Sequence, residues 1–294
     1  MAGEGGAAET AETVARRSYG KLVAFLAART RDVAACPKTR PRAHTDAAPW
    51  ETAGMVEREI TVTTPEGAMP TFVFHPDEGG PHPVVLYLMD APGIRPALKD
   101  MARRLASAGY YVMLPNLYYR GGQFEELGVS DEDAHRRAEL MQMVDPTNIV
   151  SDANALLAAA ADDPAASDGP VGAVGFCMSG GLALSVARAR PDRLAAVASI
   201  HGAWLVRDTP DSPHLGLDPV RAEVHFAWVV PDPTAPEETI AVMEQALTDA
   251  GVTYTIDRET EAQHGFAPAG PRYDEAASER HWARVLDLFD RTLR

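Results

Sequence analysis

Cysteine is nearly absent from this chain: its 294 residues contain only Cys36 and Cys177, which excludes a disulfide framework. No run approaches the roughly 20 apolar residues of a membrane-spanning helix, and no basic-then-apolar signal opens the chain. Positive charge is also scarce, since 27 Lys and Arg face 42 Asp and Glu, a net charge of −15. This excess argues against nucleic acid or an anionic membrane as a partner. We therefore expect a cytoplasmic monomer or homodimer.

The composition that is present is that of a soluble globular enzyme, with 46% hydrophobic and 23% charged residues. It is not uniform along the chain. Residues 1–54 hold 8 Lys and Arg against 6 Asp and Glu, which leaves 19 against 36 for the remainder. We expect residues 1–54 to be an N-terminal extension of one helix and a linker, and residues 55–294 to form one domain.

From residue 55 onward the pattern alternates between strands and helices. Residues 59–63 and 70–74 alternate as a hairpin does, and residues 83–89 form the continuous apolar run of a strand buried on both faces. Further strands are expected over 110–114, 171–176, 194–200, 223–230 and 253–257, and helices over 96–108, 130–143, 182–188, 236–250 and 275–292. This order predicts an α/β fold with a mostly parallel central sheet flanked by helices on both faces.

The segment Gly175-Phe176-Cys177-Met178-Ser179-Gly180-Gly181 joins an expected strand to an expected helix. It resembles the G-x-S-x-G turn that carries the nucleophile of many hydrolases, with Cys177 in place of serine. Glycines suit such a sharp turn because larger side chains would collide. The start of the following helix favours a thiolate. Ser179 is not the nucleophile in this frame, and the alternative for Cys177 is a small buried apolar residue.

A nucleophilic thiol needs an imidazole within hydrogen-bond reach and an acid that orients the imidazole. Asp232 follows the expected strand 223–230, and His264 follows the last expected strand, so both lie where parallel strands end. The order Cys177, Asp232, His264 is that of α/β-hydrolases. Other candidates are His201 and Asp257 at strand ends, and His225 within a strand, where we expect packing.

Four segments together resemble the dienelactone hydrolase, or carboxymethylenebutenolidase, family over roughly residues 56–293. They are residues 88–93 (Leu-Met-Asp-Ala-Pro-Gly), 114–120 (Leu-Pro-Asn-Leu-Tyr-Tyr-Arg), 175–181 (Gly-Phe-Cys-Met-Ser-Gly-Gly) and 263–266 (Gln-His-Gly-Phe). The resemblance implies an α/β-hydrolase fold and a triad of Cys177, His264 and Asp232.

The resemblance also implies supporting roles beside the triad. Asp90 stands where the family keeps a carboxylate that holds the cysteine proton until substrate arrives. The backbone N–H groups of Ala91 and Met178 correspond to its oxyanion hole, whose donors stabilise the transition state. The implied reaction is hydrolysis of a small ester or lactone. No His, Cys or Asp cluster has ligand spacing, so we expect no metal and no cofactor.

Two positions depart from the family pattern. Asp90 replaces a glutamate, so its carboxylate reaches about one methylene less far. Pro268 stands where the family places an arginine for the substrate carboxylate. Arg95, Arg120 and Arg272 are the candidates to replace that arginine, because a guanidinium binds a carboxylate through two hydrogen bonds.

Two functional hypotheses remain at this point. The first is hydrolysis of an ester or lactone through a thioester on Cys177. The second is a non-hydrolytic binding or thiol-redox protein on the same scaffold, since fold alone does not guarantee chemistry. The presence of both His264 and Asp232 favours the first.

The extension needs a separate interpretation. Residues 12–36 resemble a fragment of a sigma factor of the extracytoplasmic-function type, followed by the linker 37–42. One helix cannot bury its own apolar stripe. The extension is therefore either a fused remnant, the result of a start codon placed before Met55, or a helix that docks on the hydrolase or on a second subunit.

Overall fold

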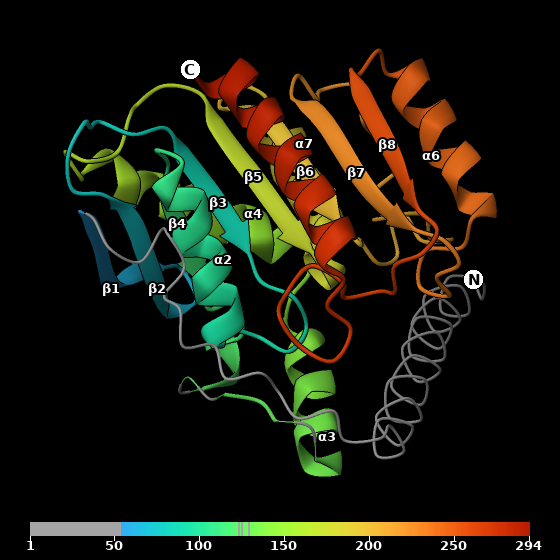
Figure 1. The fold of residues 1–294 in the computed structure, drawn as a ribbon, viewed down its shortest axis with the longest axis horizontal. Helices are drawn as coiled ribbons and strands as arrows, with labels where there is room; N and C mark the ends of the chain where they lie inside the picture. Colours follow the sequence, from blue (N-terminus) through green and yellow to red (C-terminus); the bar gives the residue numbers. More distant parts are fainter. Residues whose placement is uncertain (1–53, 123, 125, 129) are drawn as a thin grey trace, which may run out of the picture. The chain divides into compact units, whose positions relative to one another are not determined.

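The computed structural model describes residues 54–122, 124, 126–128 and 130–294 (Figure 1). The helix and linker expected before residue 54, and the sigma-factor resemblance, lie outside these residues. The chain divides into two compact units. The described part of one falls within residues 127–142, and that of the other covers residues 54–126 and 143–294.

The smaller unit contains one described helix, α3 (Asp131–Met141). Ser130 caps it by accepting a hydrogen bond from the backbone N–H of Asp133, while the Asp133 side chain accepts from the N–H of Ser130. This capping box satisfies two of the N–H groups that a helix start leaves unpaired. The expected helix over 130–143 is therefore present.

The larger unit is built on an eight-stranded sheet. In spatial order the strands are β1 (Met55–Thr64), β2 (Gly67–Pro76), β4 (Tyr111–Pro115), β3 (Val84–Leu88), β5 (Val171–Phe176), β6 (Leu194–Ile200), β7 (Glu223–Val229) and β8 (Tyr254–Glu259). β2 pairs antiparallel with both neighbours, and every other pair of these strands is parallel. The prediction of a mostly parallel sheet is confirmed.

Helices cover both faces of this sheet. They are α2 (Pro96–Ser107), α4 (Pro146–Ala161), α5 (Gly180–Ala189), α6 (Glu238–Asp249) and α7 (Glu275–Leu293). In Figure 1, α2 and α7 lie in front of the strands and α4 lies behind them. A Cβ on Gly172 would meet Leu293 of α7 at 2.9 Å, and a Cβ on Gly180 of α5 would collide with the side chain of Ser199. Gly172 and Ser199 lie on opposite faces, because Ser199 pairs with Gly175, three residues beyond Gly172.

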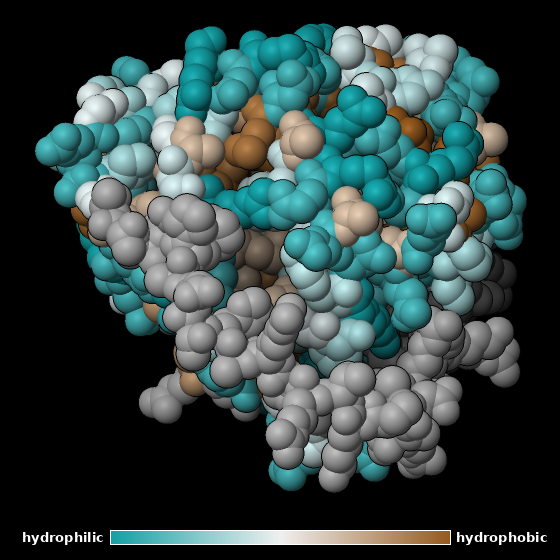
Figure 2. Space-filling model, in the orientation of Figure 1, coloured by the Kyte–Doolittle hydropathy of each residue, from teal (hydrophilic) through white to brown (hydrophobic). Residues whose placement is uncertain are grey.

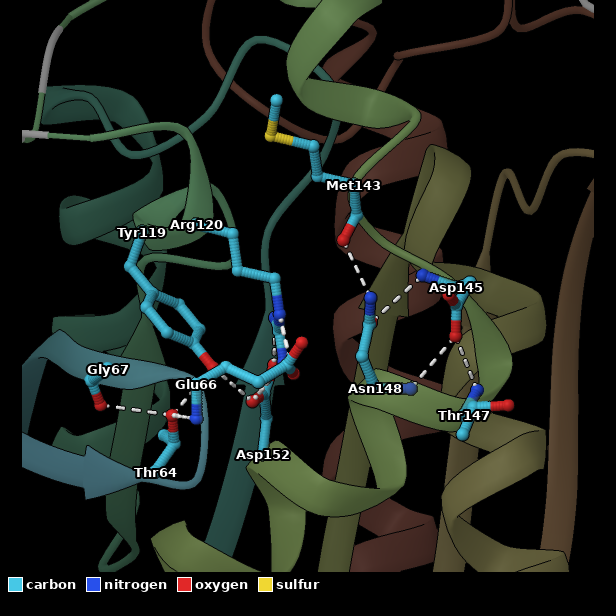
Figure 3. Close-up of polar contacts among 10 residues, drawn as sticks. All are labelled: Thr64, Glu66, Gly67, Tyr119, Arg120, Met143, Asp145, Thr147, Asn148 and Asp152. Atoms are coloured by element: carbon cyan, nitrogen blue, oxygen red, sulfur yellow. Dashed lines mark hydrogen bonds and ion pairs between the residues drawn. The ribbon is translucent and has the colours of Figure 1, made fainter.

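Helix α4, over residues 146–161, was not predicted from the sequence. The signals for this helix lie in the residues at its start. Asp145 accepts from the N–H groups of Thr147 and Asn148 at 2.7 and 2.9 Å, and the Asn148 side chain accepts from the Asp145 N–H (Figure 3). Pro146 fills the first helical position, where its missing N–H costs nothing.

A buried ionic network joins α4 to the hairpin of β1 and β2. Asp152 of α4 is fully buried and accepts hydrogen bonds from the Tyr119 hydroxyl at 2.8 Å and from two nitrogens of Arg120 at 2.8 and 2.9 Å (Figure 3). Arg120 also pairs with Glu66, and Thr64 hydrogen-bonds to Tyr119. The network fixes the loop after β4, to which Tyr119 and Arg120 belong.

Strand order determines where a site can form. β3 leads through α2 to β4 on one side, whereas β5 leads through α5 to β6 on the other. Between β3 and β5 the direction of winding therefore reverses, and α/β sheets bind ligands at the carboxyl ends of such a pair. The loops after these two strands contain Asp90 and Cys177.

On the face drawn in Figure 2, hydrophilic residues predominate and hydrophobic residues show in patches between them. Among the described residues, no helix is both long enough and apolar enough to cross a membrane.

Candidate active site

Cys177 stands on a sharp turn directly after β5. Its φ is +53°, a left-handed conformation that residues other than glycine seldom adopt. A Cβ on Gly175 would collide with the backbone carbonyl of Ser179, so the turn requires glycine there. The buried Ser179 hydroxyl donates to the Met89 carbonyl at 2.5 Å, which ties the turn to the end of β3. This bond occupies the Ser179 hydroxyl, whereas Cys177 on the same turn is partly exposed.

The thiol is one end of a chain of hydrogen bonds. His264 Nε2 lies 3.0 Å from Cys177 Sγ, and His264 Nδ1 lies 2.5 Å from Asp232 Oδ2. The other oxygen of Asp232 accepts from the backbone N–H and the hydroxyl of Thr234, each at 2.8 Å. Both oxygens of this buried carboxylate are therefore engaged, which fixes the orientation of the His264 ring.

The charges along this chain of hydrogen bonds favour the imidazolium form of His264. Burial by itself lowers the pKa of His264, but the Cys177 thiolate and the Asp232 carboxylate outweigh it and raise that pKa to about 10. Burial by itself raises the pKa of Asp232, yet the hydrogen bond from His264 brings it below its ordinary value. An imidazolium stabilises an adjacent thiolate, the nucleophilic form of cysteine.

The hydrogen-bond partner of Asp90 is Arg95 and not Cys177, the partner that the family resemblance implied. Its two oxygens accept from the two terminal nitrogens of Arg95, at 2.6 and 2.8 Å, and in the described part of the chain no hydrogen bond joins Asp90 to Cys177. Arg95 immediately precedes α2, so it reaches back five residues to the carboxylate. Burial opposes the charge of Arg95, but Asp90 raises its pKa above the ordinary value.

Ala91 and Met178 lie side by side at the switch point. Leu88 pairs with Gly175, and each of the two residues follows its strand partner by three positions. The Tyr118 hydroxyl donates to the Ala91 carbonyl at 2.8 Å and lies 3.4 Å from Met178 Sδ. The hydrogen bond of the turn that contains Ala91 runs from the N–H of Gly93 to the carbonyl of Asp90 at 2.9 Å, so the Ala91 amide is not part of it.

The three candidate arginines lie in different surroundings. Arg95 is paired with Asp90, and Arg120 with Asp152 and Glu66. Arg272 lies against the backbone after the histidine: its Nη1 is 3.4 Å from the His264 carbonyl oxygen. Among the described residues it makes no ion pair.

The other candidate residues do not take part in the chain of hydrogen bonds from Asp232 to Cys177. The buried His201 ring packs edge-on against His264 with centroids 5.2 Å apart, and burial lowers its pKa well below the ordinary value. His225 bonds to Thr255 at 2.9 Å within the sheet. Asp257 pairs with Arg284 near the surface.

Two residues of the site, Thr234 and Tyr118, were not predicted from the sequence. Thr234 could have been found, because Asp232 followed two residues later by an N–H donor is the pattern of an Asx turn. Tyr118 carried no such signal, since its contacts with Ala91 and Met178 join loops after different strands. In the described part of the chain, no group of three or more His, Cys, Asp or Glu side chains could hold a metal ion.

A mostly parallel sheet wound in both directions, with the sharp turn of Cys177 at its switch point, has the architecture of an α/β-hydrolase. The comparisons with known proteins then define the family. The model of the dienelactone hydrolase family matches residues 69–293. The chain therefore belongs to the dienelactone hydrolase family and is a hydrolase of the carboxylic ester or lactone class.

Individual relatives support the assignment of the chain to this family. The chain is 30% identical over 244 residues to a protein of Methylorubrum extorquens named "Putative carboxymethylenebutenolidase", which covers 80% of this chain and 81% of that one. It is 29% identical over 223 residues to the carboxymethylenebutenolidase of Rhodococcus opacus, across 74% of this chain and 84% of that one. A solved "Putative Dienelactone Hydrolase" from Klebsiella pneumoniae has the same fold, with a TM-score of 0.72 at 24% identity over 81% of this chain and 99% of that one.

Proposed function

We propose that the protein cleaves its ester or lactone by acyl transfer to Cys177, with His264 as the acid–base group and Asp232 as its orienting carboxylate. The observation that carries the proposal is the unbroken chain from Asp232 through His264 to Sγ, on a turn whose backbone is held in a left-handed conformation. A residue that merely packs needs neither feature.

The reaction follows from these positions. The Cys177 thiolate attacks the carbonyl carbon, and the resulting oxyanion lies toward the N–H groups of Ala91 and Met178. As the intermediate collapses, His264 gives its Nε2 proton to the departing alkoxide and a thioester remains. Water then attacks the thioester, His264 takes its proton, and collapse of the second intermediate releases the carboxylic acid and restores the thiolate.

Arg272 is the residue that we propose for a carboxylate on the substrate. Asp90, Asp152 and Glu66 already neutralise the other two candidate arginines, whereas Arg272 lies beside the catalytic histidine without an ion pair among the described residues. A hydrogen bond to a charged group contributes about 1.5–3 kcal/mol, and about 1.4 kcal/mol is a factor of ten. We expect Arg272→Met to lower kcat/KM for an ester that carries a carboxylate by about 10- to 100-fold.

The comparison substrates for Arg272 are p-nitrophenyl hemisuccinate and p-nitrophenyl butyrate, which differ in the terminal charge of the acyl chain. The butyrate should be cleaved equally by wild type and Arg272→Met. Arg284→Met, which removes an arginine paired with Asp257 at the surface, is the matched control and should change neither rate. Equal losses on both esters would remove Arg272 as a carboxylate partner.

The nucleophile is tested with Cys177→Ala and with dienelactone and small aryl and alkyl esters as substrates. Turnover should vanish while the thermal unfolding midpoint stays near that of wild type, because Cys177 is only partly buried. A covalent acyl adduct on Cys177, trapped by acid quench and located by mass spectrometry, is the expected intermediate. Full ester turnover in Cys177→Ala would refute the mechanism.

The alternative of a non-hydrolytic thiol-redox protein has a separate signature. It requires a sulfenic acid or mixed disulfide on Cys177 together with no turnover of any ester. The relay from Asp232 to the thiol favours hydrolysis, because it supplies the proton that an alkoxide leaving group needs and that thiol exchange does not.

A further inference from the structure

The residues around Cys177 include a second ion pair that the triad does not use. Asp90 is buried, with 5% of its side chain exposed, and Arg95 covers both of its oxygens. The pair belongs to the loop between β3 and α2, next to the nucleophile turn, since β3 and β5 are adjacent strands. Arg95 also interacts electrostatically with Cys177.

A buried carboxylate near a thiolate needs a counter-ion. Without one, it can take a proton itself or it can turn toward the sulfur and disfavour the ionised form through repulsion between like charges. The ionised site contains three negative groups, Cys177, Asp232 and Asp90, and two positive groups, His264 and Arg95. Removal of Arg95 therefore leaves three negative groups against one positive group.

We propose, on the basis of the cysteine mechanism above, that Arg95 is a positioning residue that holds the Asp90 carboxylate away from Cys177. The resting protein then keeps its nucleophile as the thiolate partner of the His264 imidazolium, without waiting for substrate to displace a carboxylate. The fork geometry is essential, because two N–H groups occupy both oxygens at once.

Other groups act on the same sulfur through His264. Asp232 bonds to the far side of the imidazole, the neutral His201 ring packs against it, and Arg272 contacts its backbone carbonyl. The hydrogen bonds of Arg95 go to Asp90 and Gly93, but its charge also acts on the buried side chains of Tyr87 and His201. A variant of Asp90 is therefore needed to assign a change in thiol ionisation to the carboxylate.

Arg95 has a second contact that the experiment must separate. Its Nη1 also donates to the Gly93 carbonyl at 3.0 Å, and Gly93 closes the turn that carries Ala91. Replacement of Arg95 can therefore slow ester turnover by moving an oxyanion donor. Alkylation of the thiol by iodoacetamide needs no oxyanion hole, and this reagent is neutral, so loss of a nearby cation does not repel or attract it.

The experiment measures the rate of carboxamidomethylation of Cys177 in the full chain between pH 5 and 10, by peptide mass spectrometry that separates Cys177 from Cys36. Arg95→Met should react at least about tenfold more slowly than wild type at pH 7, where a change of one pKa unit is tenfold in thiolate. Its rate should approach that of wild type near pH 10.

Two further variants identify the cause. The double variant Asp90→Asn with Arg95→Met removes the carboxylate as well and should recover the wild-type rate to within about threefold. Arg103→Met on α2, which breaks a surface pair with Glu57 and Asp100, is the matched control and should react like wild type.

Specific outcomes overturn the inference. One is an Arg95→Met profile that superimposes on the wild-type profile. Another is a double variant as slow as Arg95→Met, because Arg95 would then not act through Asp90. If Arg95→Met does not fold, Arg95→Lys serves instead, since an ammonium lacks the fork: slower alkylation at pH 7 supports the inference and an unchanged rate overturns it.

Ester turnover, measured on the same preparations, keeps the two proposals apart. The expected alkylation pattern without any ester turnover would refute the proposed function and leave the role of Arg95 intact. Turnover that depends on Cys177, together with identical alkylation profiles, would refute only the role of Arg95.

Discussion

Replacement of Asp152 by alanine is a stringent test of how the loop after β4 is held. The carboxylate is fully buried and accepts three hydrogen bonds, from the Tyr119 hydroxyl and from two nitrogens of Arg120. The Arg120 side chain is 10% exposed, and its other partner, Glu66, is 49% exposed. Asp152→Ala therefore leaves a largely buried guanidinium with only a surface partner.

Breaking a buried ion pair from one side costs about 3–5 kcal/mol, because the other charge stays buried. The total free energy of unfolding of a folded domain is about 5–15 kcal/mol. We expect Asp152→Ala to lower the free energy of unfolding by about 3–5 kcal/mol in urea titrations followed by circular dichroism. Arg120→Met combined with Asp152→Leu should recover much of this loss, since neither variant side chain carries a charge.

The matched control is Glu279→Ala. Glu279 also makes a two-point contact with an arginine, Arg104, but its side chain is 52% exposed. Exposed ion pairs contribute about 0–1 kcal/mol. A loss below about 1 kcal/mol in Asp152→Ala, or an equal loss in both variants, would show that burial does not set the value of the Asp152 contacts.

Three other predictions concern the site. Gly175→Ala should lower kcat about 100-fold, because its Cβ would displace the Ser179 carbonyl and with it the nucleophile turn; Gly270→Ala, which has room for a Cβ, should not, and equal kcat values for the two variants would contradict the steric argument. Tyr118→Phe should lower kcat about tenfold with little change in KM, because it frees the Ala91 carbonyl beside an oxyanion donor; a change confined to KM would point instead to substrate contact. The pKa of His264 is about 10 in the folded protein and near 6.5 in an unfolded chain. Protonation of His264 therefore contributes its full share to the free energy of unfolding below pH 6.5, and this contribution is lost as the pH rises through 10. Urea titrations at pH 7 and 10.5 should therefore show the gap in unfolding free energy between wild type and His264→Gln shrinking, and a growing gap would contradict this sign.

Local patterns were enough to predict most of the sheet. The continuous apolar run at 83–89 became β3, which is buried on both faces, and the alternating run at 59–63 lies within β1. Helix α4 was missed because its alanines give no distinct apolar stripe, although Asp145 and Pro146 mark its start. Strand order was also out of reach, since pairing joins segments far apart in the chain.

The kinds of groups available and their order can be read from the sequence: a cysteine on a glycine-lined turn, an aspartate and a histidine after later strands, and a net negative charge. Which of these groups contact one another depends on how the distant elements pack. In the folded protein His264 hydrogen-bonds to the Cys177 thiol, Arg95 pairs with Asp90, and Arg120 pairs with Asp152. The three candidate arginines cannot be distinguished by residue type. An arginine is neutralised when packing between distant elements places a buried carboxylate next to it, as Asp90 is for Arg95 and Asp152 is for Arg120.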